Sequence, residues 1–245
     1  MKAVKNRGGK FLRQLWPRSL DSGRPGLQHH GIMKNVFFGL LAVLVSSMSV
    51  FAEEGWIPML NGKDLSGWKS NEEKPSVFSI KDGELVVNGG RTHLFYTGVD
   101  GNAKFRNFEF KAKVKTTPGS NSGLYFHTEF QEKGWPSKGF ECQVNATHSD
   151  SKKSGGLYAV ADVMDQAPHK DDEWFDYSIK VEGRHIVISI NGKITTDWTQ
   201  PEDWDPEKTL KNMPGRKLGE GTIAIQAHDP KCVVHFKEMF IKALP

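Results

Sequence analysis

Acid–base and hydrogen-bonding side chains recur at every second position in two segments, 121–127 and 140–145. Alternation of apolar and polar residues predicts a strand in each segment, because successive side chains of a strand point to opposite faces. The polar faces carry Tyr125, His127, Glu141 and Gln143. Carboxylates and imidazoles move protons, and phenols and amides bind hydroxyl groups. The pattern indicates an acid–base or sugar-binding surface, but a half-exposed sheet with solvated polar residues has the same pattern.

A third segment, 221–228, has Gln226 and His228 on one face by the same period. If its polar face joins the other two, these residues converge with Glu141 on one patch. His228 changes charge near neutral pH and suits a base or an acid, whereas Gln226 does not titrate and can only bind. A packed or solvated histidine is the alternative for His228. Glu141 has three interpretations: a base, a metal ligand or an acceptor for sugar hydroxyls.

His148 follows the second strand and is expected at the rim of the same patch. With Asp150 it would help to hold a divalent cation, and a loop-capping pair is the alternative. Tyr125, Tyr158 and Trp135 suit stacking against sugar rings, because each combines a flat apolar face with a polar tip.

The charge of the chain is unevenly distributed. In total, 33 Lys and Arg residues against 29 Asp and Glu residues give a net charge of +4. Residues 1–52 contain 8 of the basic residues and one acid, which leaves 25 basic and 28 acidic residues, or −3, in the remainder. This near-neutral balance gives no electrostatic basis for nucleic-acid binding.

Residues 33–52 have the pattern of a secretory signal peptide, with Lys34 near the start, an apolar run over 36–50 and Ala52 at the end. The run is shorter than the ~20 residues that span a bilayer, so we expect cleavage and export rather than a stable membrane span. Residues 1–32 are then a leader or an extension of the gene model, and the mature chain, 53–245, is a single periplasmic or secreted domain.

Residues 53–245 consist largely of short segments in which apolar and polar residues alternate, and almost none shows a helical period. Gly83 and Gly192 each follow an Asp or Asn in a hairpin turn. We expect a polar, glycine-ended loop over 150–156, a strand over 156–160, and a surface loop with one helical turn over 199–217. Together these features predict an all-β fold, an antiparallel β-sandwich of the jelly-roll type.

Cys142 and Cys232 fall on apolar faces of predicted strands. In an exported chain they form either a disulfide or two buried thiols. The two strands that carry them are expected to be neighbours. Two thiols are favoured, because adjacent strand positions seldom meet the required separation and dihedral angle. The sequence contains no zinc-like spacing of Cys and His, nucleophile elbow or dinucleotide-binding fingerprint.

Five collinear segments resemble the DUF1080 family, the 3-keto-disaccharide hydrolase or 3-keto-glucoside lyase/hydratase domain. They are 56–68, 121–127, 141–148, 191–192 and 223–228, and the resemblance covers essentially all of residues 55–245. It implies a concanavalin A-like jelly roll whose concave sheet binds carbohydrate, and an activity on glycosides already oxidised at C3.

The sequence departs from the family at two positions, His127, where members often carry arginine, and Asp229, where they often carry glycine. On a 3-keto-glycoside, a base removes the acidified hydrogen of C2, the enolate expels the C1 substituent, and hydration gives the free 3-keto sugar. We expect Glu141 and His228 to be catalytic. The expected substrate-binding residues are Tyr125, His127, Gln143, His148, Tyr158 and Gln226.

No cofactor is certain, and a divalent cation held by Glu141, His148 and Asp150 would polarise the ketone. Because the sequence lacks a redox motif, a separate sugar oxidoreductase must act upstream. The alternative function is a non-catalytic carbohydrate-binding module, since one fold serves both purposes.

Overall fold

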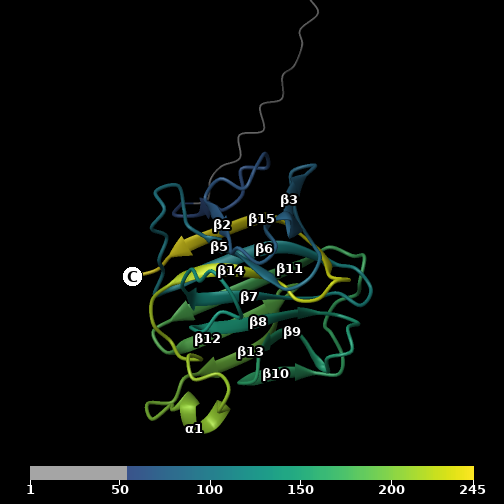
Figure 1. Ribbon diagram of the computed structural model, residues 1–245. Coiled ribbons are helices and arrows are strands. Elements are labelled where there is room, and N and C mark those ends of the chain that lie inside the picture. The colour runs from purple at the N-terminus through teal and green to yellow at the C-terminus, as the bar shows by residue number, and fades with distance from the viewer. Residues whose placement is uncertain (1–53) are drawn as a thin grey trace, which may run out of the picture. The chain divides into compact units, whose positions relative to one another are not determined.

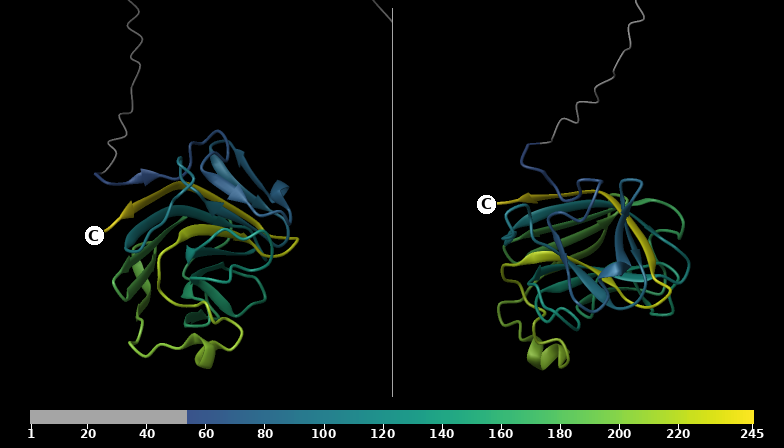
Figure 2. Two further views of the ribbon diagram at one scale, coloured as in Figure 1. Left: turned by 60° about the vertical axis from the view of Figure 1, so that its left-hand side comes forward. Right: turned by 45° about the horizontal axis from the view of Figure 1, so that its top comes forward.

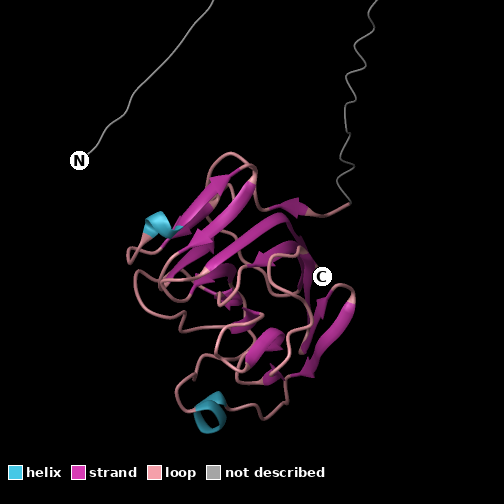
Figure 3. Cartoon of the chain, turned by 90° about the vertical axis from the view of Figure 1, so that its right-hand side faces the viewer, coloured by secondary structure: helices cyan, strands magenta, loops and turns pink. Residues whose placement is uncertain are grey.

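Two antiparallel sheets make up the part of the chain that the computed structural model describes, residues 54–245 (Figure 1). The predicted signal peptide and leader lie outside the described residues. Figure 3 shows how little helix accompanies the strands, namely the 3-10 turn η1 (Pro75–Val77) and the short helix α1 (Pro206–Leu210). The predicted all-β sandwich is confirmed.

The first sheet has the strand order β13-β12-β11-β6-β15-β4-β3, and β1 pairs with β15. Its strands are β1 (Ile57–Pro58), β3 (Phe78–Lys81), β4 (Glu84–Asn88), β6 (Phe108–Thr116), β11 (Phe175–Glu182), β12 (His185–Ile190), β13 (Lys193–Thr199) and β15 (Val233–Ala243). Burial alternates strictly along β6, so this sheet turns one face to the core and the other outward.

The second sheet has the order β10-β9-β8-β7-β14-β5-β2. Its strands are β2 (Trp68–Ser70), β5 (Thr92–Tyr96), β7 (Asn121–Thr128), β8 (Phe140–Asn145), β9 (Lys152–Leu157), β10 (Ala161–Met164) and β14 (Thr222–Ala227). Every residue of β7, β8 and β14 is buried. These three strands are therefore covered on both faces, by the other sheet on one side and by loops on the other.

The expected hairpins are present where the turn residues indicate them. Asp82 and Gly83 between β3 and β4 have φ values of 52° and 80°, and Asn191 and Gly192 between β12 and β13 have 50° and 74°. Positive φ at both central residues is what a tight two-residue hairpin requires. The segment 199–217 is a loop with one short helix, as predicted, and Figure 2 shows it in yellow-green along the lower end of the molecule.

Two expectations for the segment after β8 are wrong. Residues 152–157 form β9 rather than a loop, and residues 158–160 form a turn rather than a strand, with Ala159 at φ 63°. The glycines that suggested a loop serve close packing instead. A Cβ on Gly156 would lie 2.6 Å from the backbone nitrogen of Val163 in β10, so only glycine fits there.

Cys142 and Cys232 are both buried and unbonded. Cys142 lies in β8 of the second sheet, whereas Cys232 directly precedes β15 of the first sheet, so they are not on neighbouring strands as expected. Burial raises the pKa of the Cys142 thiol well above its usual value, and that of Cys232 to about 11. The prediction of two buried thiols is confirmed. Over residues 54–245, no helix is long and apolar enough to cross a membrane.

Candidate active site

Three neighbouring strands, β8, β7 and β14, bring the predicted polar side chains together. Tyr125 of β7 pairs with Glu141 of β8, and Gly123 of β7 lies between Gln143 of β8 and Gln226 of β14. Gly123 has a steric role, because a Cβ at this position would lie 2.7 Å from Oε1 of Glu141. The absence of a side chain at Gly123 therefore lets the Glu141 carboxylate reach across β7 to Gln226.

A hydrogen-bond network engages both oxygens of Glu141. Oε2 accepts from the Tyr125 hydroxyl and from Nη2 of Arg216, each at 2.8 Å, and Oε1 accepts from Nε2 of Gln226 at 2.8 Å. The Glu141 and Arg216 side chains are each only 7% exposed. A buried ion pair is tolerated when further hydrogen bonds satisfy its atoms, and the Glu141 carboxylate meets that condition.

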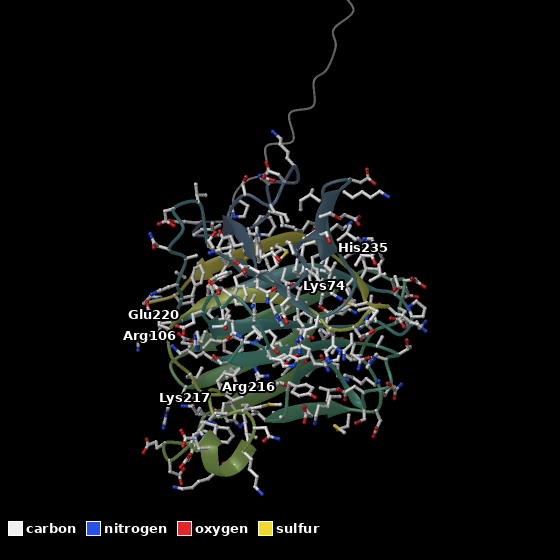
Figure 4. The ribbon with its side chains drawn as sticks, viewed as in Figure 1. Lys74, Arg106, Arg216, Lys217, Glu220 and His235 are labelled. Atoms are coloured by element: carbon white, nitrogen blue, oxygen red, sulfur yellow. The ribbon has the colours of Figure 1, made fainter. Side chains whose placement is uncertain are left out.

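Arg216 comes from the loop that carries α1, far from Glu141 in the sequence. Trp204 of the same loop donates its indole N–H to the Arg216 carbonyl at 2.7 Å, and Nη1 of Arg216 donates to the Gly139 carbonyl at 3.4 Å. The guanidinium lies 5.1 Å from the centre of the Tyr125 ring. Figure 4 shows Arg216 between this loop and the strands. Sequence patterns do not reveal Arg216, because a single arginine in an irregular loop has no period.

Burial and charge set the protonation of these groups. Burial raises the pKa of Tyr125 well above its usual value, and the Glu141 carboxylate adds to the rise. Burial alone would lower the pKa of Arg216, but Glu141 and Tyr125 outweigh it and the net shift is upward. Burial, followed by the charge of Asp150, raises the pKa of Tyr158 to about 12. At neutral pH both phenols keep their hydrogens and the guanidinium keeps its charge.

The network is the floor of a pocket with a volume of about 430 Å³. Tyr158 and His228 stand at its sides, both partly exposed. Two loops complete the mouth and contribute Trp135, Pro136, Ser137, Asn212, Met213 and Pro214. A pocket of this size, with a few converging polar groups, is typical of a small-molecule site.

Three buried polar atoms of the pocket residues have no hydrogen-bond partner in the structure: Oδ1 of Asn121, Oε1 of Gln226 and Nε of Arg216. Buried polar atoms are nearly always paired, so these atoms are open to a partner from beyond residues 54–245, either water or a ligand. The set offers two acceptors and one charged donor. It therefore suits a ligand that has both hydroxyl groups and an electron-rich oxygen.

The structure places six of the expected site residues at the pocket, namely Tyr125, Glu141, Gln143, Tyr158, Gln226 and His228. Trp135, expected as a stacking platform, lies at the mouth with its ring centre 5.1 Å from that of His228. Their roles toward a substrate stay predictions. Asn121 and Arg216 are pocket residues that sequence reasoning missed.

His127 does not lie at the pocket, contrary to expectation. Its Nε2 lies 2.8 Å from the Arg106 carbonyl, and its ring packs against Phe126 and Phe108. The cause is local, because His127 has φ 54° and the pairing of β7 with β14 shifts register beside it. Such an irregularity ends the alternation of faces on which the expectation rested. Burial also lowers the pKa of His127.

The expected metal ligands do not fit a metal centre. The oxygens of Glu141 are engaged in the floor network, and Asp150 uses Oδ1 to accept from the Lys152 amide at 2.9 Å. Nδ1 of His148 accepts from the Asp150 amide at 3.1 Å, which corresponds to the loop-capping alternative. Among residues 54–245, no three His, Cys, Asp or Glu side chains are grouped so as to hold a metal ion.

Comparison with solved structures supports the architecture. The chain is similar to a crystal structure of a candidate glycosyl hydrolase from Parabacteroides distasonis, with a TM-score of 0.67 and 23% identity, covering 78% of this chain and 95% of the other. It is also similar to a Bacillus subtilis protein with a galectin-like fold, with a TM-score of 0.53 and 12% identity, covering 76% of this chain and 94% of the other. At these identities the likeness establishes the fold alone.

The chain is a jelly-roll sandwich with a polar pocket on one sheet, and its family and curated relative place it in the class of carbohydrate-active domains. The family model described as the 3-keto-alpha-glucoside-1,2-lyase-like domain matches residues 55–242, and the chain belongs to this family. A 3-keto-disaccharide hydrolase of Bacteroides thetaiotaomicron is 26% identical over 231 residues, which cover 78% of this chain and 79% of the relative.

Proposed function

We propose that this protein is an enzyme that cleaves 3-keto-glycosides by elimination across C1 and C2 followed by hydration, with net hydrolysis of the glycoside. The observation that carries the proposal is the balance of charge in the pocket. Among the described residues, Glu141 is the one acidic residue that lines it, and both of its oxygens are already engaged. An ordinary glycosidase needs two carboxylates that flank the scissile bond, and this pocket lacks that pair.

Arg216 stabilises the negative charge that develops on the C3 oxygen. When C2 loses its proton, the electron pair moves to the C2–C3 bond and the ketone oxygen becomes negative. A buried guanidinium with an unpartnered Nε is suited to stabilise that oxygen, because it is charged and already fixed in place. Glu141 orients Arg216 and Tyr125 as their shared acceptor, and this is its role in place of the expected general base.

His228 removes the proton from C2. Among the described residues that line the pocket, it is the one imidazole, and it is not held in the floor network, so it suits a general base. Tyr158 is suited to protonate the leaving oxygen, because its raised pKa keeps the hydrogen on the phenol until a stronger base forms nearby. Asn121, Gln143 and Gln226 bind the remaining hydroxyl groups of the sugar.

The proposed substrate must be oxidised at C3 before it reaches the pocket. We therefore infer that a separate sugar oxidoreductase supplies it. The signal-like pattern over residues 33–52 supports export, and the reaction would then take place in the periplasm or outside the cell.

The test compares two substrates that differ only at C3, an aryl glucoside and its 3-keto form. The purified protein is expected to release the aryl alcohol from the oxidised substrate alone. In heavy water, the released 3-keto sugar should carry deuterium at C2, measured against the same sugar incubated without protein. Release from the unoxidised glucoside without deuterium would contradict the proposal, and tight binding of either sugar with no release would instead indicate a carbohydrate-binding module.

A further inference from the structure

One carboxylate oxygen lies between two histidines at the side of the pocket. Oδ2 of Asp229 is 3.3 Å from Nδ1 of His228 and 3.4 Å from Nε2 of His148. The two imidazole ring centres are 5.9 Å apart. All three side chains are partly buried, with 35% of His228, 26% of Asp229 and 22% of His148 exposed. The cluster belongs to the turn after β14 and to the loop after β8, so neither strand provides it alone.

The hydrogen positions in this cluster follow from its partners. The backbone N–H of Asp150 donates to Nδ1 of His148 at 3.1 Å, and the amide of Asn121 lies 3.5 Å from the same nitrogen. Nδ1 of His148 is therefore an acceptor, and the hydrogen of the neutral ring is on Nε2, which faces Asp229. Because an ionised carboxylate only accepts, the hydrogen of His228 is on Nδ1.

Asp229 is itself held in place. Its Oδ1 accepts from the Lys231 amide at 3.3 Å, and its carbonyl accepts from the Cys232 amide at 2.9 Å. His148 is held as well, since its backbone N–H donates to Oδ1 of Asn145 at 2.9 Å. A carboxylate fixed in this way can orient a neighbouring ring without reorganisation.

We infer that Asp229 and His148 are positioning residues that fix the tautomer of His228, leaving Nε2 of His228 as the free base for the substrate. This inference rests on the proposed function for its catalytic meaning. The proton of C2 moves to Nε2 of His228, the C–H electron pair forms the C2–C3 double bond of the enolate, and collapse of the enolate breaks the C1–O bond. The electron pair of that bond leaves with the aglycone oxygen, which takes up a proton from Tyr158.

The carboxylate also stabilises the imidazolium that forms. The groups that face His228 are Asp229, His148, the Trp135 ring and, more distantly, His93, whose pKa is lowered chiefly by burial and in part by Arg91 and His228. Asp229 is the one negative charge among them. Loss of that charge removes both the orientation of the ring and the compensation of its positive charge.

His148 couples this cluster to the substrate-binding floor. The Asn121 amide nitrogen is directed to Nδ1 of His148, and the unpartnered Oδ1 of Asn121 belongs to the pocket. His148 therefore orients two different groups. It directs Oδ1 of Asn121 toward a sugar hydroxyl, and it holds the Asp229 carboxylate that positions His228.

The test replaces Asp229 with asparagine, which preserves shape and removes charge. Asp229→Asn is expected to lower kcat by about 10²-fold or more, as loss of an oriented base does, with KM changed by less than about threefold. The control is Asp197→Asn, because Asp197 lies 2.7 Å from His185 in an exposed Asp–His pair on the other sheet. That control should retain full activity.

A second measurement determines the tautomer of His228 and does not depend on turnover. It is the imidazole ¹⁵N chemical shift of His228 in protein with ¹⁵N-labelled histidine. The inference requires protonated Nδ1 in the unsubstituted protein and loss of that state in Asp229→Asn. Protonated Nε2 in the unsubstituted protein, or an Asp229→Asn variant with normal kcat, would overturn it. A divalent ion that restored activity to the EDTA-treated protein and shifted both histidines would also overturn it, since the cluster would then be a metal site. If the unsubstituted protein shows no turnover, the proposed function fails and the chemical shifts still decide the inference.

Discussion

Arg216 and Glu141 form a buried ion pair at 2.8 Å although they are 75 positions apart in the sequence. The pair joins the loop that carries α1 to the centre of the second sheet. Within residues 54–245, it places the one arginine of the pocket lining beside the one carboxylate there. Stability and chemistry at the pocket therefore depend on the same two residues.

Breaking this ion pair on one side should destabilise the protein strongly. Arg216→Met leaves the Glu141 charge buried without its counter-ion, and the expected loss in the free energy of unfolding is ~3–5 kcal/mol. Glu141→Gln likewise leaves the Arg216 charge buried without its counter-ion, so a loss of similar size is expected. The double variant should lose less than the sum of the two single losses, because neither charge remains. Urea denaturation monitored by tryptophan fluorescence measures all three.

The matched control for these variants is Arg184→Met. Arg184 pairs with Glu202 at 3.0 Å, but 47% and 86% of the two side chains are exposed. An exposed pair contributes ~0–1 kcal/mol, so this variant should change little. Additive losses in the Glu141 and Arg216 double variant would show that the two charges do not depend on each other.

Gly123→Ala should disturb the floor network without replacing any residue that makes a hydrogen bond in it. The new Cβ would lie 2.7 Å from Oε1 of Glu141, so the carboxylate must move away from Gln226. We expect a loss of ~1–3 kcal/mol in the free energy of unfolding, as for other overpacking changes. We also expect kcat/KM to fall by more than about tenfold, because a displaced Glu141 no longer holds Arg216 in place.

Gly219→Ala provides the comparison, since nothing lies within 4 Å of a Cβ at that position. It should leave kcat/KM and the unfolding midpoint nearly unchanged. A crystal structure of Gly123→Ala with Glu141 in its original position would refute the steric explanation.

His93 should make stability depend on pH in the acid range. Its pKa is lowered to about 3, chiefly by burial, and neither ring nitrogen has a hydrogen-bond partner among the described residues. The unfolded state, with the usual pKa of about 6.5, binds a proton at pH 5 and the folded state does not. The contribution of His93 is therefore fully present above pH ~6.5 and is lost as pH falls toward 3, with a slope of ~1.4 kcal/mol per pH unit.

His93→Phe should reduce that slope, measured as the free energy of unfolding between pH 6.5 and 4. Some slope should remain, because burial also lowers the pKa of His127 and His169. Phe95→Leu alters the neighbouring packing without a titrating group, and its cost should be equal at every pH. An unchanged slope in His93→Phe would mean that His93 is not held neutral.

The alternation of apolar and polar residues, together with the residue types at the turns, sufficed to predict the sandwich. The Asp82-Gly83 and Asn191-Gly192 turns lie where the sequence indicates, and the polar faces of 121–125, 141–143 and 226 meet on one sheet. These features are local or follow from strict alternation along a strand, and both kinds can be read from a single sequence.

The errors arise where the backbone departs from regular geometry. His127 was expected on the polar face, but the register shift beside it turns it away from the pocket. Gly155 and Gly156 resemble loop residues, yet they belong to β9, where neighbouring strands approach too closely for a side chain. Alternation contains no information about a bulge, and composition does not distinguish a flexible glycine from a closely packed one.

Arg216 and Asp229 could not be assigned roles from the sequence for a different reason. Each lies in an irregular segment and has a partner far along the chain, Glu141 for Arg216 and His148 for Asp229. Only the tertiary structure brings such pairs together.

The distance along the chain between the floor residues also determines when the pocket can form during synthesis. The oxygens of Glu141 lack these partners until Arg216, 75 positions later, and Gln226, 85 positions later, have been synthesised. Strand β7 likewise lacks one neighbour until β14 has been made. Because such long-range contacts form slowly, a ribosome-bound chain that stops before residue 216 exposes an uncompensated carboxylate and an open strand edge. The pocket is thus one of the last parts of this protein to form, and a nascent chain is most vulnerable to aggregation in the interval before the final strands emerge.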